Sequence, residues 1–134
     1  QTGILQLAAD KMLMFSESLG SGSLPMGFSS FFLANLINNQ PMTILMTNIL
    51  LNQGLDFQSL IFREQAYSLI IASNLGANLT LIGALAGIMW QRLLEQKNLK
   101  ISYFQFFKKG VCITPITFVV TLMTLHVVLN YIFP

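Results

Sequence analysis

The sequence predicts an all-α membrane protein whose helices lie in a lipid bilayer. Hydrophobic residues make up 54% of its 134 residues and charged residues only 9%, whereas a typical soluble domain carries charge on about a quarter of its residues. The charges are clustered, and uncharged stretches cover residues 18–55, 65–91 and 110–134. Each stretch exceeds the roughly 20 apolar residues that a membrane-crossing helix needs. We therefore expect one multi-pass membrane domain over residues 1–134.

The N-terminal segment, residues 1–19, is predicted to be a helix because its apolar residues recur at helical spacing. Asp10 and other charges interrupt it, so the end of a spanning helix and an interfacial helix both remain open. Glycine and serine at residues 20–23 then break the helix. Because the first residue is Gln1 and no signal-peptide pattern follows, we expect the chain to begin within a longer protein.

A helical hairpin is predicted over residues 25–52. Its middle is Asn38-Asn39-Gln40-Pro41. These are three amide side chains followed by a proline, which has no backbone N–H. The arms, residues 26–37 and 42–52, are about 17 to 18 Å long at 1.5 Å per residue, shorter than a bilayer core about 30 Å thick. Two half-length arms indicate a re-entrant hairpin whose tip faces a protein interior. The alternative is a turn between two helices outside the bilayer.

A second interruption lies inside a predicted transmembrane helix at residues 65–93. Glycine at Gly76 permits backbone angles closed to other residues, while the side chains of Asn78 and Thr80 offer the backbone alternative hydrogen-bond partners. An unwound segment between two half-helices is therefore expected. The alternative is that these small and amide residues only pack helices together.

The remaining segments set the orientation. Basic residues cluster in residues 94–109, which we interpret as a cytoplasmic loop with an interfacial helix because cytoplasmic loops are rich in Lys and Arg. Residues 110–133 form the predicted last transmembrane helix, which Pro115 is able to kink. The C-terminus and the loop at residues 54–64 are then external, and both hairpin arms enter from outside.

Two ionisable residues in apolar helices are candidates for carrying protons. His126 lies in the last helix, where an ionisable side chain is a functional hypothesis by default. Near the external end, it is also explained as a partly hydrated packing residue. Asp10 has the same two interpretations, because a carboxylate at uncertain depth is either functional or simply solvated or paired.

Several functional classes do not fit the composition. The lone Cys112 leaves no disulfide within the chain and no multi-thiolate metal cluster, so no metal or other cofactor is expected. The basic residues sit in loops, which gives no nucleic-acid surface. Because no nucleophile with a base or metal set is visible, we do not expect an enzyme. A membrane enzyme or a non-transport membrane subunit remains the alternative of another class.

Two amide-rich helix breaks instead indicate a solute-binding site, because many secondary transporters hold solutes at discontinuous helices. Three motifs carry a resemblance over essentially the whole chain: Asn-Leu-Ile-Asn-Asn-Gln-Pro at 35–41, the run at 73–86, and residues 101–110 followed by Thr114-Pro115. Together they resemble the arsenite permease (ArsB) family of the ion transporter superfamily. The sequence departs from the family's pattern at Gln40, which replaces an apolar residue, and at Leu81 and Ala84, which replace Pro and Ser.

The resemblance implies half of an inverted-repeat secondary transporter, with a re-entrant helical hairpin and a discontinuous transmembrane helix from each half around the site. This chain supplies the second pair and lacks the N-terminal half. Carried over by position, the substrate-binding residues are Asn38, Asn39 and Pro41 at the hairpin tip and Gly76, Asn78, Thr80 and Gly83 in the broken helix.

The implied function is export of arsenite or antimonite across the inner membrane, driven by the proton gradient. Each is a neutral trihydroxide near neutral pH, and amides and hydroxyls supply the donors and acceptors that it needs. The same oxygens suit Na⁺, so a sodium/proton antiporter or an organic-anion carrier of the superfamily is the alternative. The expected partners are a small inorganic solute, the lipid bilayer and the N-terminal half, while a homodimer and an ATPase subunit remain open.

Overall fold

The computed structural model describes residues 2–132, and every regular element in that part of the chain is helical. This confirms the all-α part of the predicted fold class. In chain order, the elements are α1 (Thr2–Ser18), α2 (Ser23–Ile37), α3 (Asn39–Leu51), α4 (Leu60–Asn74), the 3₁₀ helix η1 (Gly76–Leu79), α5 (Leu85–Gln96) and α6 (Tyr103–Ile132).

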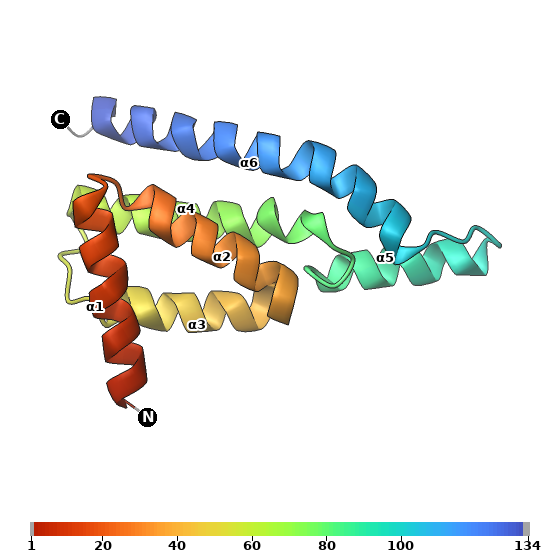
Figure 1. The fold of residues 1–134 in the computed structure, drawn as a ribbon, viewed down its shortest axis with the longest axis horizontal. Helices are drawn as coiled ribbons and strands as arrows, with labels where there is room; N and C mark the ends of the chain where they lie inside the picture. Colours follow the sequence, from red (N-terminus) through yellow and green to blue (C-terminus); the bar gives the residue numbers. More distant parts are fainter. Residues whose placement is uncertain (1, 133–134) are drawn as a thin grey trace.

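The helices form an elongated bundle (Figure 1). α2 and α3 make a hairpin that turns part-way along the long axis, and α4 packs against both arms. Beyond the level of the turn, α4 gives way to η1 and then to α5, which extends the molecule further. α6 returns along α4, while α1 runs across the opposite end of the bundle. The hairpin turn therefore lies beside the interruption between α4 and α5.

Apolar side chains at helical spacing hold the hairpin against α4. Met26 and Ala34 of α2, Met42 and Met46 of α3, and Leu69 of α4 are buried in one cluster. The adaptable thioether chains of methionine fill the irregular space between three helices. The core therefore fixes the hairpin to α4 from its open end almost to its turn.

A second apolar cluster attaches α6 to the hairpin. Phe118 and Leu122 of α6 are buried against Phe31 of α2, with the Phe31 and Phe118 ring centroids 4.7 Å apart. A Cβ atom added at Gly27 would lie 2.7 Å from a methyl carbon of Leu122, so α2 approaches α6 closely at this point. α6 therefore packs over the same α2 face that supports the interruption.

Two helices begin earlier than expected because polar side chains cap them. α4 begins at Leu60 instead of residue 65, and the Ser59 hydroxyl accepts a hydrogen bond from the Phe62 N–H (3.3 Å). α6 begins at Tyr103, so the interfacial helix expected within residues 94–109 is continuous with the last helix. Ser102 and Gln105 accept hydrogen bonds from each other's backbone N–H groups (3.2 and 3.1 Å). This capping box nucleates the helix well before residue 110.

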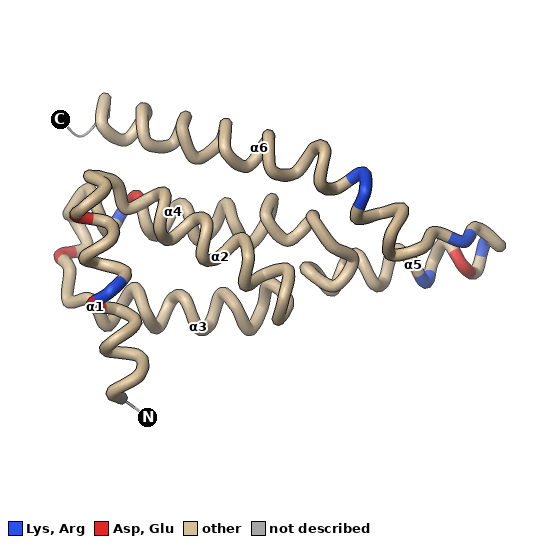
Figure 2. Tube along the Cα trace, in the orientation of Figure 1, with Lys and Arg blue, Asp and Glu red and all other residues tan. Residues whose placement is uncertain are grey.

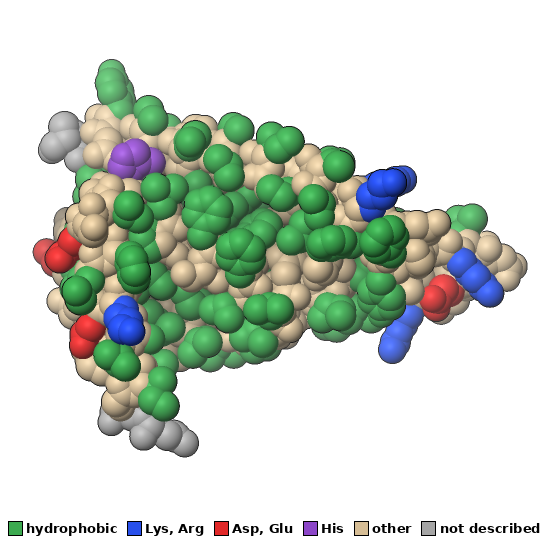
Figure 3. Space-filling view, viewed as in Figure 1, with side chains coloured by type: hydrophobic (Ala, Val, Ile, Leu, Met, Phe, Trp, Pro, Cys, Tyr) green, Lys and Arg blue, Asp and Glu red, His purple; other side chains and the backbone are tan. Residues whose placement is uncertain are grey.

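Charged residues gather at the two ends of the bundle and leave its middle uncharged (Figure 2). In the space-filling view, hydrophobic side chains cover the middle (Figure 3). Within the described range, α6 is the one helix long and apolar enough to cross a membrane, and α2 is a shorter apolar helix. One end carries Asp10, Lys11, Glu17, Asp56, Arg63 and Glu64, and the other carries Arg92, Glu95, Lys97, Lys100, Lys108 and Lys109.

Candidate functional site

The two amide-rich breaks lie against each other. A single residue, Asn38, separates α2 from α3, and its φ of 77° is a value that asparagine tolerates better than most residues. The backbone N–H of Asn39 donates to the Gly83 carbonyl (2.9 Å), and the Asn38 side-chain amide donates to the Ile82 carbonyl (2.9 Å). The hairpin turn is thereby joined to the segment that precedes α5.

Asn35 of α2 is the central link between the breaks. Its amide nitrogen donates to the carbonyls of Phe31 and Gly76 (2.8 Å each). Its amide oxygen accepts from both the backbone N–H (3.0 Å) and the hydroxyl (3.1 Å) of Thr80. Three of these four hydrogen bonds reach Gly76 and Thr80 and hold the interruption in place, while the fourth stays within α2.

Two glycines allow this close approach. A Cβ atom at Gly83 would overlap the Ala77 carbonyl oxygen and lie 2.8 Å from the Asn35 amide oxygen. A Cβ atom at Gly76 would lie 2.9 Å from the Phe31 ring. Any side chain at either position would therefore push the interruption away from α2.

The helix ends at the breaks differ in what they offer a solute. At the start of α3, the Asn39 N–H donates to the Gly83 carbonyl and the Gln40 N–H donates to the Asn38 side chain. The Met42 N–H donates to the Asn38 carbonyl, and Pro41 has no backbone N–H. At α5, no side chain caps the N-terminus, which follows Ala84. In α5 the Gly87 N–H bonds to the Ala84 carbonyl (3.0 Å). Because the first N–H groups of a helix lack partners within it, the donors at the start of α5 are the N–H groups of Leu85 and Ala86.

A polar groove lies where α3 begins and α4 ends. It has a volume of about 420 Å³. The Asn39 side chain crosses it to donate to the Ser73 carbonyl (3.3 Å), and Thr43 donates to the Asn39 carbonyl (2.7 Å). Apart from Ile44, its lining consists of amide and hydroxyl side chains, namely Asn39, Gln40, Thr43, Ser73 and Asn74.

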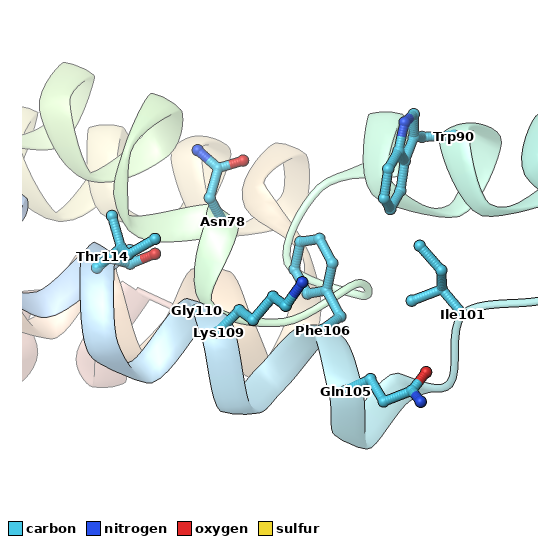
Figure 4. Close-up of a pocket in the computed structure, with 9 residues that line it drawn as sticks. Asn78, Trp90, Ile101, Gln105, Phe106, Lys109, Gly110 and Thr114 are labelled. Atoms are coloured by element: carbon cyan, nitrogen blue, oxygen red, sulfur yellow. The ribbon is translucent and has the colours of Figure 1, made fainter.

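A second cavity, of about 530 Å³, lies on the opposite side of the interruption. Figure 4 shows Asn78 reaching it from η1, Trp90 from α5, and the remaining polar groups from α6. Its walls are mainly apolar, and the Trp90 and Phe106 ring centroids are 6.1 Å apart. The polar side chains that line it are Asn78, Gln105, Lys109 and Thr114.

Comparison with known proteins identifies the family. The family described as arsenical pump membrane protein (ArsB) matches residues 2–129. The chain belongs to this family. The resemblance in the amide motifs is therefore confirmed, and the family's description places its members in a membrane.

The ArsB match is supported by individual relatives. The arsenical pump membrane protein of Escherichia coli K12 is 32% identical over 97% of the chain and 28% of that protein. That of Yersinia enterocolitica is 34% identical over 88% of the chain and 26% of that protein. The P protein of Sus scrofa is 30% identical over 90% of the chain and 15% of that protein. The chain therefore spans about a quarter of the curated arsenical pump relatives. No solved structure matches it.

The residues proposed from the ArsB resemblance divide into three groups in the structure. Asn39 lines the polar groove and Asn78 the cavity on the other side, so they do not meet at one surface. The contact between the breaks is made by Asn38, Thr80, Gly76 and Gly83. Pro41 is exposed in the first turn of α3. Sequence reasoning missed Asn35, whose signal was an isolated amide within an apolar helix.

Proposed function

We propose that the protein containing this chain is a secondary active transporter that exports arsenite or antimonite, driven by the proton gradient. One observation carries the proposal beyond family membership: the groove at the meeting of the two helix breaks is lined almost entirely by uncharged hydrogen-bonding side chains. A neutral trihydroxide needs several donors and acceptors and no countercharge. Amides and hydroxyls supply both without the cost of burying a charge.

The hairpin dimensions support a re-entrant arrangement. α2 and α3 have 15 and 13 residues, or about 22 and 20 Å at 1.5 Å per residue. Neither arm spans a bilayer core about 30 Å thick, whereas α6 with its 30 residues does. We therefore place the hairpin turn inside the membrane, with the inner-membrane bilayer around the uncharged middle of the bundle.

The charge distribution supports the orientation. The end formed by α5 and the start of α6 is strongly basic, and the end formed by α1 and the start of α4 is mainly acidic. By the positive-inside rule, the α5 end is cytoplasmic and the hairpin opens to the outside. The polar groove then lies about half-way between the two surfaces, as solute sites of secondary transporters do.

Within this proposal, the seven residues have different roles. Asn39 binds the solute in the groove, together with Thr43 and Ser73. The backbone that positions these solute-binding side chains is shaped by Asn38, Pro41, Thr80, Gly76 and Gly83. Asn78 lines the cytoplasmic side and contacts the solute on its way to the groove. The equivalent hairpin and broken helix of the N-terminal half complete the site.

A second candidate function rests on the same oxygens. Carbonyl and amide oxygens at helix breaks also coordinate Na⁺ in transporters. Sodium coupling, as in a sodium/proton antiporter or an organic-anion carrier, is therefore the alternative. The two functions differ in what drives solute movement.

The deciding experiment is arsenite efflux from cells that express the full-length protein. We expect efflux that persists when choline replaces Na⁺ and that falls when an ionophore collapses the proton gradient. Cells with an empty vector provide the baseline. Movement of another solute that requires Na⁺, without arsenite efflux, would establish the alternative and refute the proposal.

A further inference from the structure

A buried carboxylate lies at the end of the bundle opposite α5. Within the described residues, Glu64 of α4 is the one charged side chain that is fully buried, with 1% of its surface exposed. The sequence alone places it in a polar loop, whereas the structure places it in the first turns of α4. A buried carboxylate is costly unless charged or hydrogen-bonding partners compensate it, so its partners show what it does.

Three elements of the fold converge on this carboxylate. One oxygen accepts a hydrogen bond from the backbone N–H of Gly22, in the turn between α1 and α2. The other lies 2.6 Å from Nδ1 of His126 on α6 and 3.4 Å from the amide nitrogen of Asn130, one turn further along α6. Glu64 therefore ties α6 and the α1–α2 turn to α4.

The partner of Glu64 is itself able to exchange a proton. His126 and Glu64 make the one salt bridge found in the described part of the chain. The imidazole is 41% exposed in its side chain, whereas the carboxylate side chain is 2% exposed. Histidine is the side chain that most readily gains and loses a proton near neutral pH. A proton from water thus reaches the pair through the His126 ring and returns the same way.

The number of protons on the pair decides whether the buried charge is balanced. With the imidazole protonated, carboxylate and imidazolium neutralise each other at hydrogen-bonding distance. When the proton returns to water, the carboxylate keeps its negative charge, and its partners among residues 2–132 are the Gly22 N–H, the Asn130 amide and a neutral ring. Leaving a buried charge uncompensated is strongly destabilising. Loss of the proton therefore favours a state in which α6 separates from α4 and water reaches Glu64.

In the part of the chain that the structure describes, the salt bridge of Glu64 is with His126, and the other charged groups at this end lie on several elements. α2, and α6 beyond Lys109, carry no further Asp, Glu, Lys or Arg, and Tyr131 of α6 is exposed. On α4, Arg63 hydrogen-bonds to Gln58, and Tyr67 is exposed. The remaining charged residues are Asp10, Lys11 and Glu17 on α1 and Asp56 in the connection before α4, all of them exposed.

Two buried hydroxyls extend from this pair toward the helix breaks. Ser68 follows Glu64 by one turn of α4, and Ser30 lies on α2 between the Gly22 turn and Asn35. Both side-chain oxygens are buried and have no hydrogen-bond partner within the described residues. Buried polar groups in this state are normally satisfied by water or by a second conformation. α2 and α4 thus each carry a buried hydroxyl without a hydrogen-bond partner among the described residues, located along the chain between the pair and the helix breaks.

We propose that Glu64 and His126 form the proton-binding site of transport, in which proton binding holds α6 against α4 and proton loss releases it. This inference rests on the proposed function and names the residues that couple it to the proton gradient. In the orientation proposed above, the pair lies at the external end, where an incoming proton binds first. Where the two arrangements of α6 differ in solute affinity, proton binding changes the overall affinity for solute, and linkage then requires solute binding to change the proton affinity by the same factor.

The first test measures the structural change without any solute. Ser68→Cys is introduced into the full-length protein in a background without other reactive cysteines, which includes Cys112→Ser. We expect labelling by a small thiol reagent to rise as the pH is raised from about 5 to 8. The reagent's own pH dependence is corrected with Glu17→Cys, a substitution at an exposed position. In Glu64→Gln this rise should disappear. Labelling that shows no pH dependence with the pair intact would overturn the proposal.

The second test separates coupling from transport. In membrane vesicles, Glu64→Gln and His126→Gln should lose pH-gradient-driven arsenite accumulation by about tenfold, within the usual range for coupling between two sites, while keeping exchange of arsenite down its own gradient. Glu17→Gln, an exposed carboxylate at the same end, should retain both. Gradient-driven accumulation that survives in both pair variants would refute the coupling role. If no version moves arsenite while Ser68→Cys labelling still follows pH, the transport proposal fails and the proton site stands.

Discussion

The amide oxygen of Asn35 accepts hydrogen bonds from both the backbone N–H and the hydroxyl of Thr80, at 3.0 and 3.1 Å. These residues are 45 positions apart in the sequence, and their contact places the hairpin turn beside the interruption that precedes α5. The start of α3 and the end of α4, which line the polar groove, are joined directly by the hydrogen bond from the Asn39 side-chain amide to the Ser73 carbonyl.

Removing the Asn35 amide should destabilise the hairpin. Asn35→Leu keeps the size of the side chain but leaves the Gly76 carbonyl and the Thr80 N–H without their partner. A buried polar group left unpaired costs about 1–3 kcal/mol, so we expect a lower unfolding temperature for the detergent-solubilised full-length protein. Asn48→Leu on exposed α3 surface is the matched control, because the Asn48 side chain donates only to a carbonyl of its own helix. Equal stability of the two variants would show that the Asn35 bonds contribute little.

Adding one methyl group at Gly83 should be more damaging. In Gly83→Ala the new Cβ atom would overlap the Ala77 carbonyl oxygen, and backbone atoms at this point cannot move without breaking the Asn39–Gly83 hydrogen bond. We expect a marked loss of folded protein in the membrane, measured by size-exclusion chromatography of a fluorescent fusion. Gly3→Ala, where a Cβ atom meets nothing within 4 Å, should be neutral. Wild-type amounts of monodisperse Gly83→Ala protein would contradict the close packing.

Asn39 is the groove residue whose loss should affect transport most directly. Asn39→Leu removes a donor and an acceptor from the groove and should reduce arsenite efflux by about tenfold, because an unmade hydrogen bond costs on the order of 1–3 kcal/mol. Thr43→Val removes a neighbouring hydroxyl at constant shape and should raise KM more than it lowers kcat. Efflux rates are compared at equal membrane abundance, with Asn48→Leu as control. Normal kinetics in both groove variants would assign the groove a packing role only.

The orientation is testable with an impermeant thiol reagent. In a background without other reactive cysteines, Gln58→Cys in the connection before α4 should label in intact cells. Lys97→Cys after α5 should label only after the membrane is opened, because the basic end faces the cytoplasm. Both positions are exposed, so access within the chain does not limit the reaction. Labelling of both from the same side would exclude the proposed topology.

The sequence predicted the approximate positions of the two breaks. The three amides and Pro41 predicted an interruption over residues 38–41, which the structure confines to Asn38 because α3 already begins at Asn39. The glycine and amides after Ser73 predicted the other interruption, which lies between α4 and α5. Both follow from local chemistry, because proline, glycine and asparagine act on their own backbone. The starts of α4 and α6 were also encoded locally, in Ser59 and in the Ser102–Gln105 capping box, but hydropathy does not register caps.

Contacts between residues that are distant in the sequence could not be predicted from the sequence alone. Asn35 and Thr80 are ordinary polar residues in the sequence, and only the fold brings them into contact. Glu64 resembles a loop carboxylate in the sequence, and its contact with His126 on α6, 62 positions later, is visible only in the structure. Neither pair has a sequence spacing that would indicate a contact. Whether a charged side chain is buried depends on which helix packs over it. Amino-acid composition does not specify which helix that is.

The single-residue turn at Asn38 also limits how the protein can move. With no loop between them, and with the turn's N–H groups bonded within the structure, the two hairpin arms behave as one rigid body, and neither arm can swing separately as a flap. In the transport cycle proposed above, we therefore expect the groove to be exposed alternately by sliding or tilting of the whole hairpin against the 75–84 segment. Cross-linking α2 to α3 should leave such a cycle intact, whereas cross-linking the hairpin turn to that segment should arrest it.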